Sequence, residues 1–167
     1  VGASQQTVSQ YMNTWLRIHA ENVAPKTLEG YASMVRNYIS PIVGQVKLQN
    51  LEPHHLTTLN QEMSQKGLSS ATRAGCYRTI RKALGDAARQ KLIVRNPALS
   101  VTPPRQQRRE PETWSINQFN TFLKAASDDE FHKFFEVAAL TGMRRSEITG
   151  LKWDKVDLEN ESLRVAE

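Results

Sequence analysis

Apolar side chains recur at helical spacing through the first hundred residues, and this pattern predicts four amphipathic helices. The first follows Thr7 or Ser9, either of which suits a helix N-cap. The second opens at Pro25, which a first helical turn accommodates, and ends by Pro41 and Gly44. The inward positions of these two helices are Val8, Tyr11, Met12, Trp15, Leu16 and His19 in the first, and Leu28, Tyr31, Val35, Tyr38 and Ile39 in the second.

Two further helices complete this part of the chain. The third starts with Glu52-Pro53 and stops at Gly67. The fourth is the longest and runs from Leu68 to about Lys91. Their inward positions are Leu56, Leu59 and Met63 in the third helix, and Cys76, Tyr77, Ile80, Ala83, Leu84 and Ala87 in the fourth.

A second side of the longest helix is basic. It carries Arg78, Arg81, Lys82 and Arg89, while Asp86 is the only carboxylate in the helix. Such a face is either simply solvated, as on any surface helix, or in contact with phosphates. The excess of cations favours contact with a DNA backbone.

The stretch 103–111 separates the helical part from the rest of the chain. It contains three prolines and no apolar side chain, which predicts an extended linker. Arg105, Arg108 and Arg109 in this stretch either hold a phosphate backbone or are solvated, and the sequence favours neither interpretation.

The apolar pattern resumes after the linker. Ser115 and Gln118 have the spacing of a capping box, and the helix that they begin points Ile116, Phe119 and Leu123 inward. Three acids at 128–130 suit the positive end of the next helix dipole, so they do not indicate a metal site.

An apolar helical run from Phe131 to Leu140 stops at Thr141-Gly142, and a shorter helical pattern follows, with Ile148 and Leu151 inward. A turn at 159–161 then leads to an alternating stretch, Ser162 to Ala166, which is typical of a strand. The sequence therefore predicts a short hairpin at this end.

The glycine break brings two arginines to the start of a helix. Gly142 can adopt a positive φ, and the next residues belong to a helix start whose unpaired N–H groups attract phosphate. Arg144 and Arg145 stand at this junction, and a guanidinium matches two phosphate oxygens at once. The alternative is a weak i, i+3 pair between Arg144 and Glu147 on an exposed helix, which explains neither the glycine break nor the flanking pattern.

Charge and composition restrict the classes of molecule that this chain is expected to bind. Residues 1–109 hold fifteen Lys and Arg against five acids, whereas residues 110–167 hold seven against twelve. A strongly basic first part indicates a polyanionic partner such as nucleic acid. Cys76 is the only cysteine, so no internal disulfide forms and a reducing cytoplasm is the expected setting. No apolar run approaches the length of a membrane span.

The segment from Thr141 to Ile148 resembles the Thr-Gly-x-Arg-x-Ser-Glu-(Leu/Ile) segment of the tyrosine recombinases, or phage-type integrases. The similarity continues through Gly150-Leu151-Lys152-Trp153 to Asp157-Leu158. It implies a mainly α fold: a four-helix SAM-like core-binding domain, a basic linker, and the helical start of an α+β catalytic domain that ends in a β-hairpin. The implied boundaries are 1–101, 102–112 and 113–167.

The resemblance also implies roles for single residues. Arg144 is the catalytic arginine, Glu147 its acidic partner, and Arg145 the variable position. The stretches around Thr27 and from Ser69 to Arg73 are the most integrase-like parts of the helical domain. The implied DNA contacts are Lys26, Thr27, Ser70, Arg73, Arg78, Arg81, Lys82, Arg89, Arg105, Arg108, Arg109 and Arg145.

The implied reaction is DNA recombination, as in the integration of a mobile element, with neither metal nor nucleotide cofactor. The partners are double-stranded DNA and further protomers in a tetrameric synapse. The family's later lysine, His-x-x-Arg pair, further His or Trp, and tyrosine nucleophile have no matching positions here, so we expect this segment alone to be inactive. Two alternatives are a non-catalytic DNA-binding regulator on an integrase-like scaffold and a helical protein-interaction domain.

Overall fold

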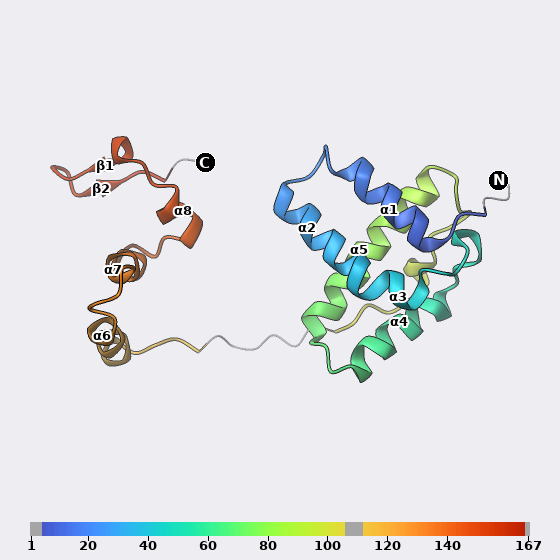
Figure 1. The fold of residues 1–167 in the computed structure, drawn as a ribbon, viewed down its shortest axis with the longest axis horizontal. Helices are drawn as coiled ribbons and strands as arrows, with labels where there is room; N and C mark the ends of the chain where they lie inside the picture. Colours follow the sequence, from blue (N-terminus) through green and yellow to red (C-terminus); the bar gives the residue numbers. More distant parts are fainter. Residues whose placement is uncertain (1–4, 106–111, 166–167) are drawn as a thin grey trace. The chain divides into compact units, whose positions relative to one another are not determined.

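The computed structural model describes residues 5–105 and 112–165 and divides into two compact units, residues 1–109 and 110–167 (Figure 1). The first unit consists of helices joined by short turns. The second holds short helices and a two-stranded hairpin. The exact ends of the predicted linker, 102 and 112, stay a prediction, and its residues 106–111 lie outside the described part.

The helices of the first unit agree with the apolar pattern. They are α1 (Val8–His19), α2 (Pro25–Met34), α3 (Ser40–Val43), α4 (Pro53–Gln65) and α5 (Ser70–Arg89), with 3₁₀ turns η2 (Leu48–Asn50) and η3 (Pro97–Ser100). Thr7 rather than Ser9 caps α1, because its side chain accepts from the Gln10 N–H while the Gln10 side chain returns to the Thr7 N–H.

The pattern predicted that the second helix ends by Pro41 and Gly44, and the helical backbone continues through Pro41 and ends just before Gly44. A π-helical turn, η1 (Val35–Ile39), joins α2 to α3, and the Ser40 N–H donates to the carbonyl of Val35, five residues back. Proline has no N–H to donate, and its ring crowds the carbonyl four residues earlier. The wider turn immediately before Pro41 accommodates that ring, so the helix can continue past the proline. It ends at Val43, before Gly44.

Helix α5 supplies the centre of the core. Its Ile80, Ala83, Leu84 and Ala87 are fully buried, as the predicted stripe requires. Three aromatic side chains fix their polar atoms at the core's edge: the Tyr11 hydroxyl donates to the Ala83 carbonyl at 2.7 Å, the Trp15 Nε1 to Asp86 Oδ2 at 2.7 Å, and the Tyr77 hydroxyl to the Ala98 carbonyl at 2.7 Å. Burial, reinforced by the charge of Asp86, raises the pKa of Tyr11.

Two helices of the first unit end in the same left-handed turn. After α4, the N–H groups of Gly67 and Leu68 donate back to the carbonyls of Ser64 and Met63, and Gly67 has φ 72°. After α5, Lys91 takes the equivalent position with φ 58°. A side chain is strained in this conformation and glycine is not.

The second unit contains α6 (Ile116–Ala125), α7 (His132–Thr141), α8 (Arg145–Thr149), the 3₁₀ turn η4 (Trp153–Lys155), β1 (Val156–Asp157) and β2 (Ser162–Leu163). The predicted capping box of Ser115 and Gln118 is confirmed. The hairpin is also present, with Val156 opposite Leu163. The Asp157 carboxylate accepts from the Asn160 side chain and from the N–H groups of Asn160 and Glu159, and these bonds lower its pKa.

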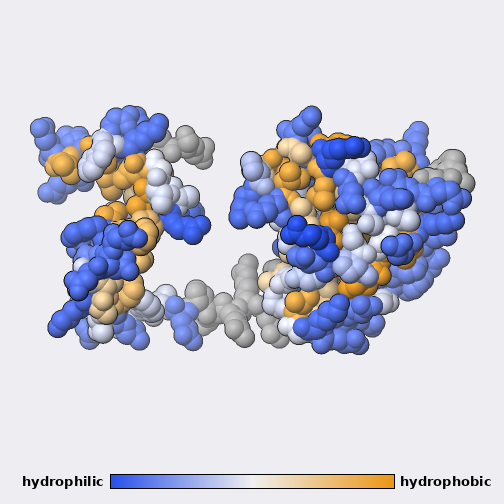
Figure 2. Space-filling view, viewed as in Figure 1, coloured by the Kyte–Doolittle hydropathy of each residue, from blue (hydrophilic) through white to orange (hydrophobic). Residues whose placement is uncertain are grey.

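The packing of the second unit is open. None of its described residues is buried, and Figure 2 shows apolar residues on its visible surface. Phe122 of α6 and Phe135 of α7 meet edge to face at 5.1 Å between ring centroids. Phe119 and Leu123 are half-buried, but the prediction that Ile116 points inward is wrong, because this side chain is 79% exposed. It is the first residue of α6, where a helical side chain points back beyond the helix end rather than along the helix.

Two further features are absent from the described part of the chain. In residues 5–105 and 112–165, no helix is both long and apolar enough to cross a membrane. Over the same residues, no group of three or more His, Cys, Asp or Glu side chains could hold a metal ion.

Candidate functional site

The glycine break is where the sequence placed it. Helix α7 ends at Thr141, and Gly142 adopts the left-handed conformation with φ 67°. The Thr141 hydroxyl accepts from the Met143 N–H at 3.3 Å, which closes the turn. Arg144 is then the N-cap of α8, in extended conformation, and Arg145 is its first helical residue.

Glu147 holds Arg144 by both its backbone and its side chain. One carboxylate oxygen accepts from the Arg144 N–H at 2.7 Å, and the other accepts from Arg144 Nη1 at 2.8 Å. These bonds, the backbone one first, lower the pKa of Glu147, so the carboxylate is ionised at neutral pH. The side chain of Arg144 is 84% exposed whereas that of Glu147 is 25% exposed.

Both features that the sequence suggested are present here: the i, i+3 ion pair between Arg144 and Glu147, and the glycine break at Gly142. A surface ion pair alone contributes little to stability, about 0–1 kcal/mol. Here the carboxylate also fixes the backbone at the helix start, which restricts where the guanidinium can lie. The exposed part of the guanidinium faces solvent, where it can receive an anion such as phosphate.

The basic face of α5 is exposed, as predicted, but its four cations have different surroundings. Lys82 Nζ lies 3.3 Å from the Tyr31 hydroxyl and 5.2 Å from the centre of that ring. Arg81 lies 6.0 Å from the centre of the Tyr77 ring. No ion pair is recorded for Arg78, Arg81 or Lys82 with any described residue, so they remain available to phosphates.

Arg89 differs from the other three, because its guanidinium bonds to the buried carboxylate of Asp86. The same carboxylate accepts from Trp15 and lies 3.5 Å from His19 Nε2. The sequence identified Asp86 as the lone acid of the helix, but it did not predict that Asp86 contacts Trp15, His19 and Arg89. The i, i+3 spacing of Asp86 and Arg89 was a signal, whereas the approach of Trp15 from α1 depends on the tertiary fold.

The remaining predicted contacts of the first unit are spread over α2 and the start of α5. Thr27 is exposed and Ser70 is half-buried. Lys26 is exposed and paired with Glu29 at 2.8 Å. Arg73 is half-buried, with Nη1 3.3 Å from Asn60 Oδ1.

The predicted linker contacts are only partly described. Arg105 is exposed. Arg108 and Arg109 lie outside the described residues, so their predicted role stays a prediction.

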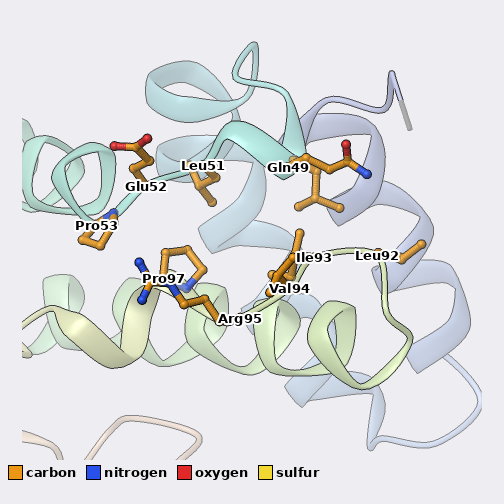
Figure 3. A pocket seen from close by; sticks show the side chains of 10 residues that line it. Gln49, Leu51, Glu52, Pro53, Leu92, Ile93, Val94, Arg95 and Pro97 are labelled. Atoms are coloured by element: carbon orange, nitrogen blue, oxygen red, sulfur yellow. The ribbon is translucent and has the colours of Figure 1, made fainter. Parts of the chain in front are cut away.

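A cleft of about 450 Å³ in the first unit holds none of the predicted site residues. Figure 3 shows its two walls, one from Leu48 to Pro53 and the other from Leu92 to Pro97. Glu52 and Arg95 stand on opposite walls. The cleft is therefore separate from the basic face of α5.

Comparisons with known proteins agree with this arrangement. The family model described as "Phage integrase, N-terminal SAM-like domain" matches residues 7–64. An integrase of Saccharopolyspora erythraea is 28% identical over 166 residues, which cover 95% of this chain and 37% of that protein. The tyrosine recombinase XerC of Pseudomonas fluorescens is 29% identical over 154 residues, which cover 86% of this chain and 50% of that protein.

The solved structure of the Tn1549 transposon integrase in complex with circular intermediate DNA matches 96% of this chain and 54% of its own, with a TM-score of 0.78 and 25% identity. The chain is therefore similar to tyrosine recombinases both in sequence and in fold. A lambda integrase tetramer bound to a Holliday junction has a TM-score of 0.81 over 93% of this chain and 45% of its own; at 16% identity, this likeness shows the fold alone.

The chain spans about half, or less, of the length of the relatives that it matches. Its first unit contains the stretch matched by the SAM-like family model. Its second unit contains the Thr141 to Ile148 segment, with Arg144 and Glu147 bonded to each other.

Proposed function

We propose that this chain is the DNA-binding portion of a site-specific tyrosine recombinase, with Arg144 as a catalytic residue of the longer protein. The observation that carries the proposal is the Arg144 junction. An exposed guanidinium stands directly after a left-handed glycine, and a carboxylate fixes it through backbone and side chain. A side chain that is held ready to bind a phosphate group requires this arrangement.

The proposed chemistry is strand exchange through a covalent intermediate. A tyrosine of the longer protein attacks the scissile phosphate, a phosphotyrosyl bond forms, and the bond to the 5′ oxygen of the next nucleotide breaks. Arg144 contacts the non-bridging oxygens, whose charge must be stabilised as phosphorus becomes five-coordinate. Glu147 positions Arg144. Loss of one such donor typically lowers the rate by about 10²–10³.

The first unit supplies the proposed ground-state contacts with DNA. Arg78, Arg81 and Lys82 contact the phosphate backbone, while Arg89 is held by Asp86 and contributes less. Duplex DNA and further recombinase protomers are the proposed partners, the cytoplasm is the proposed location, and no cofactor is needed.

Salt-dependent DNA binding tests the role of α5. Arg81→Ala with Lys82→Ala should weaken binding of the 167-residue chain about equally for all duplex sequences. It should also reduce the slope of log affinity against log salt by about 0.9 for each phosphate that the variant no longer neutralises. Arg17→Ala with Lys66→Ala removes the same charge outside α5 and is the matched control.

An equal change of slope in both pairs would show that α5 is not part of the DNA interface.

The two parts of the chain, made separately, give a second test. Residues 1–109 should bind duplex DNA weakly and residues 113–167 should not, because the cationic excess lies in the first part. Affinity that does not depend on salt would favour a protein-interaction domain instead.

A further inference from the structure

We propose that a second phosphate of the DNA backbone binds in a cleft of the second unit, beside the Arg144 junction. This inference rests on the proposed DNA-binding function and adds a site to it. The cleft measures about 470 Å³. Its lining includes Glu147 of the junction together with three cations, Lys152, Lys155 and Arg164.

The hairpin places two of these cations opposite each other. The Arg164 N–H donates to the Lys155 carbonyl at 2.9 Å, one position beyond the pairing of Val156 with Leu163. Residues directly opposite on antiparallel strands carry their side chains on the same face, and like charges there destabilise the hairpin. Asp154 offsets part of this cost at Lys155, and an anion beside Arg164 would remove more of it.

Neither of the two acids that line the cleft is paired with Lys152 or Arg164. Asp154 pairs with Lys155 at 3.2 Å, and Glu147 pairs with Arg144 at 2.8 Å. Both carboxylates are therefore already engaged by other cations. Lys152 and Arg164 are exposed, and no ion pair with a described residue is recorded for either.

These two cations are distinguished by lining the same cleft. Residues 110–167 carry twelve acids against seven Lys and Arg, yet of the cations in the described part of this range only Lys133, Arg144 and Lys155 form ion pairs. Lys133, for example, pairs with Glu136 at 2.9 Å. Two uncompensated cations in one cleft, next to a carboxylate that already holds Arg144, fit a phosphodiester that continues from the phosphate at Arg144.

The test uses the whole 167-residue chain and a fluorescent duplex, with anisotropy measured over a range of salt. Lys152→Gln with Arg164→Gln should reduce the salt slope by about 0.9 for each phosphate that these cations neutralise. Lys124→Gln with Lys133→Gln removes the same charge from the same unit and should leave the slope unchanged. Lys152→Arg with Arg164→Lys should retain most of the binding, because both charges remain.

The stability of the free chain separates an anion site from a structural role. Without DNA, Arg164→Gln should leave the hairpin intact or strengthen it, as seen in hydrogen exchange of the amide at position 164. Faster exchange would show that Arg164 acts structurally and would overturn the proposal.

Three other outcomes would also overturn it. Equal slopes in the two glutamine pairs would mean that only net charge matters. Saturation of the amide shifts around Arg164 by inorganic phosphate alone, at the concentrations used for DNA, would assign the cleft to a free ion. Failure of the unmodified chain to bind DNA at all would reject the proposed function itself, and with it this site.

Discussion

Asp86→Ala should destabilise the first unit more than any other single loss of charge on α5. The Asp86 side chain is 8% exposed, and it accepts from Trp15 Nε1 at 2.7 Å and from Arg89. Alanine would leave the indole N–H of Trp15, a residue that is 1% exposed, without an acceptor.

The magnitude follows from the two partners. A buried donor left without a partner costs about 1–3 kcal/mol. The bond to Arg89 adds no more than about 1 kcal/mol, because that guanidinium is 77% exposed and is solvated when released. We therefore expect a loss of about 1–4 kcal/mol. Each kcal/mol lowers the thermal midpoint of a domain of this size by roughly 4–8 °C.

Urea unfolding followed by helical circular dichroism measures this loss. Asp86→Asn keeps an acceptor for Trp15 and should lose only about 1 kcal/mol. Glu21→Ala, the same charge removed from an exposed position, should stay within about 0.5 kcal/mol of the unmodified chain. In a double-mutant cycle, Asp86→Ala and Trp15→Phe should couple by about 0.5–3 kcal/mol. A coupling of zero would refute the idea that this hydrogen bond ties α1 to α5.

Two further changes test the first unit. Lys91→Gly should stabilise the first unit by about 0.5–1 kcal/mol in urea titrations, because Lys91 has φ 58°. Gly67→Ala, at the equivalent turn with φ 72°, should destabilise it by a similar amount. Destabilisation by Lys91→Gly, or stabilisation by Gly67→Ala, would contradict the strain argument. Burial raises the pKa of the Cys76 thiol to about 12 from an ordinary value of 9, so the stability present below pH 9 should fall by about 1.4 kcal/mol per unit as the pH rises from 9 towards 12. Cys76→Ala should flatten this decline between pH 9 and 10, below the range where Tyr11 contributes, and an unchanged slope there would exclude the thiol as its cause.

The helices of the first unit could be predicted because their signals are local. Apolar spacing defined the buried faces of α1, α4 and α5, and Gly67 marked a helix end. The passage of the helix through Pro41 could not be predicted, because it depends on the π-helical turn that precedes the proline. Lys91 was not recognised as a left-handed turn either, since nothing local favours lysine there.

The candidate site was partly predictable for a similar reason. The glycine, Arg144 and Glu147 lie within six consecutive residues, so local spacing and the resemblance were enough to place them. The contacts of Lys82 with Tyr31 and of Trp15 with Asp86 join α5 to other helices, and no spacing rule connects such distant positions. For Ile116, the periodic pattern was present but the side chain is 79% exposed, because periodicity alone does not decide burial at a helix end.

The central claim is tested most directly by separating cleavage from binding in a longer protein that continues through the tyrosine nucleophile. Arg144→Ala should abolish formation of the covalent protein–DNA adduct on a nicked duplex while DNA affinity stays close to that of the unmodified protein, because the loss falls on the transition state. Arg145→Ala, which removes the same charge at the next position, should lower adduct formation far less. Adduct formation at the unmodified rate by the Arg144→Ala protein, or an equal loss in both variants, would contradict the role assigned to Arg144.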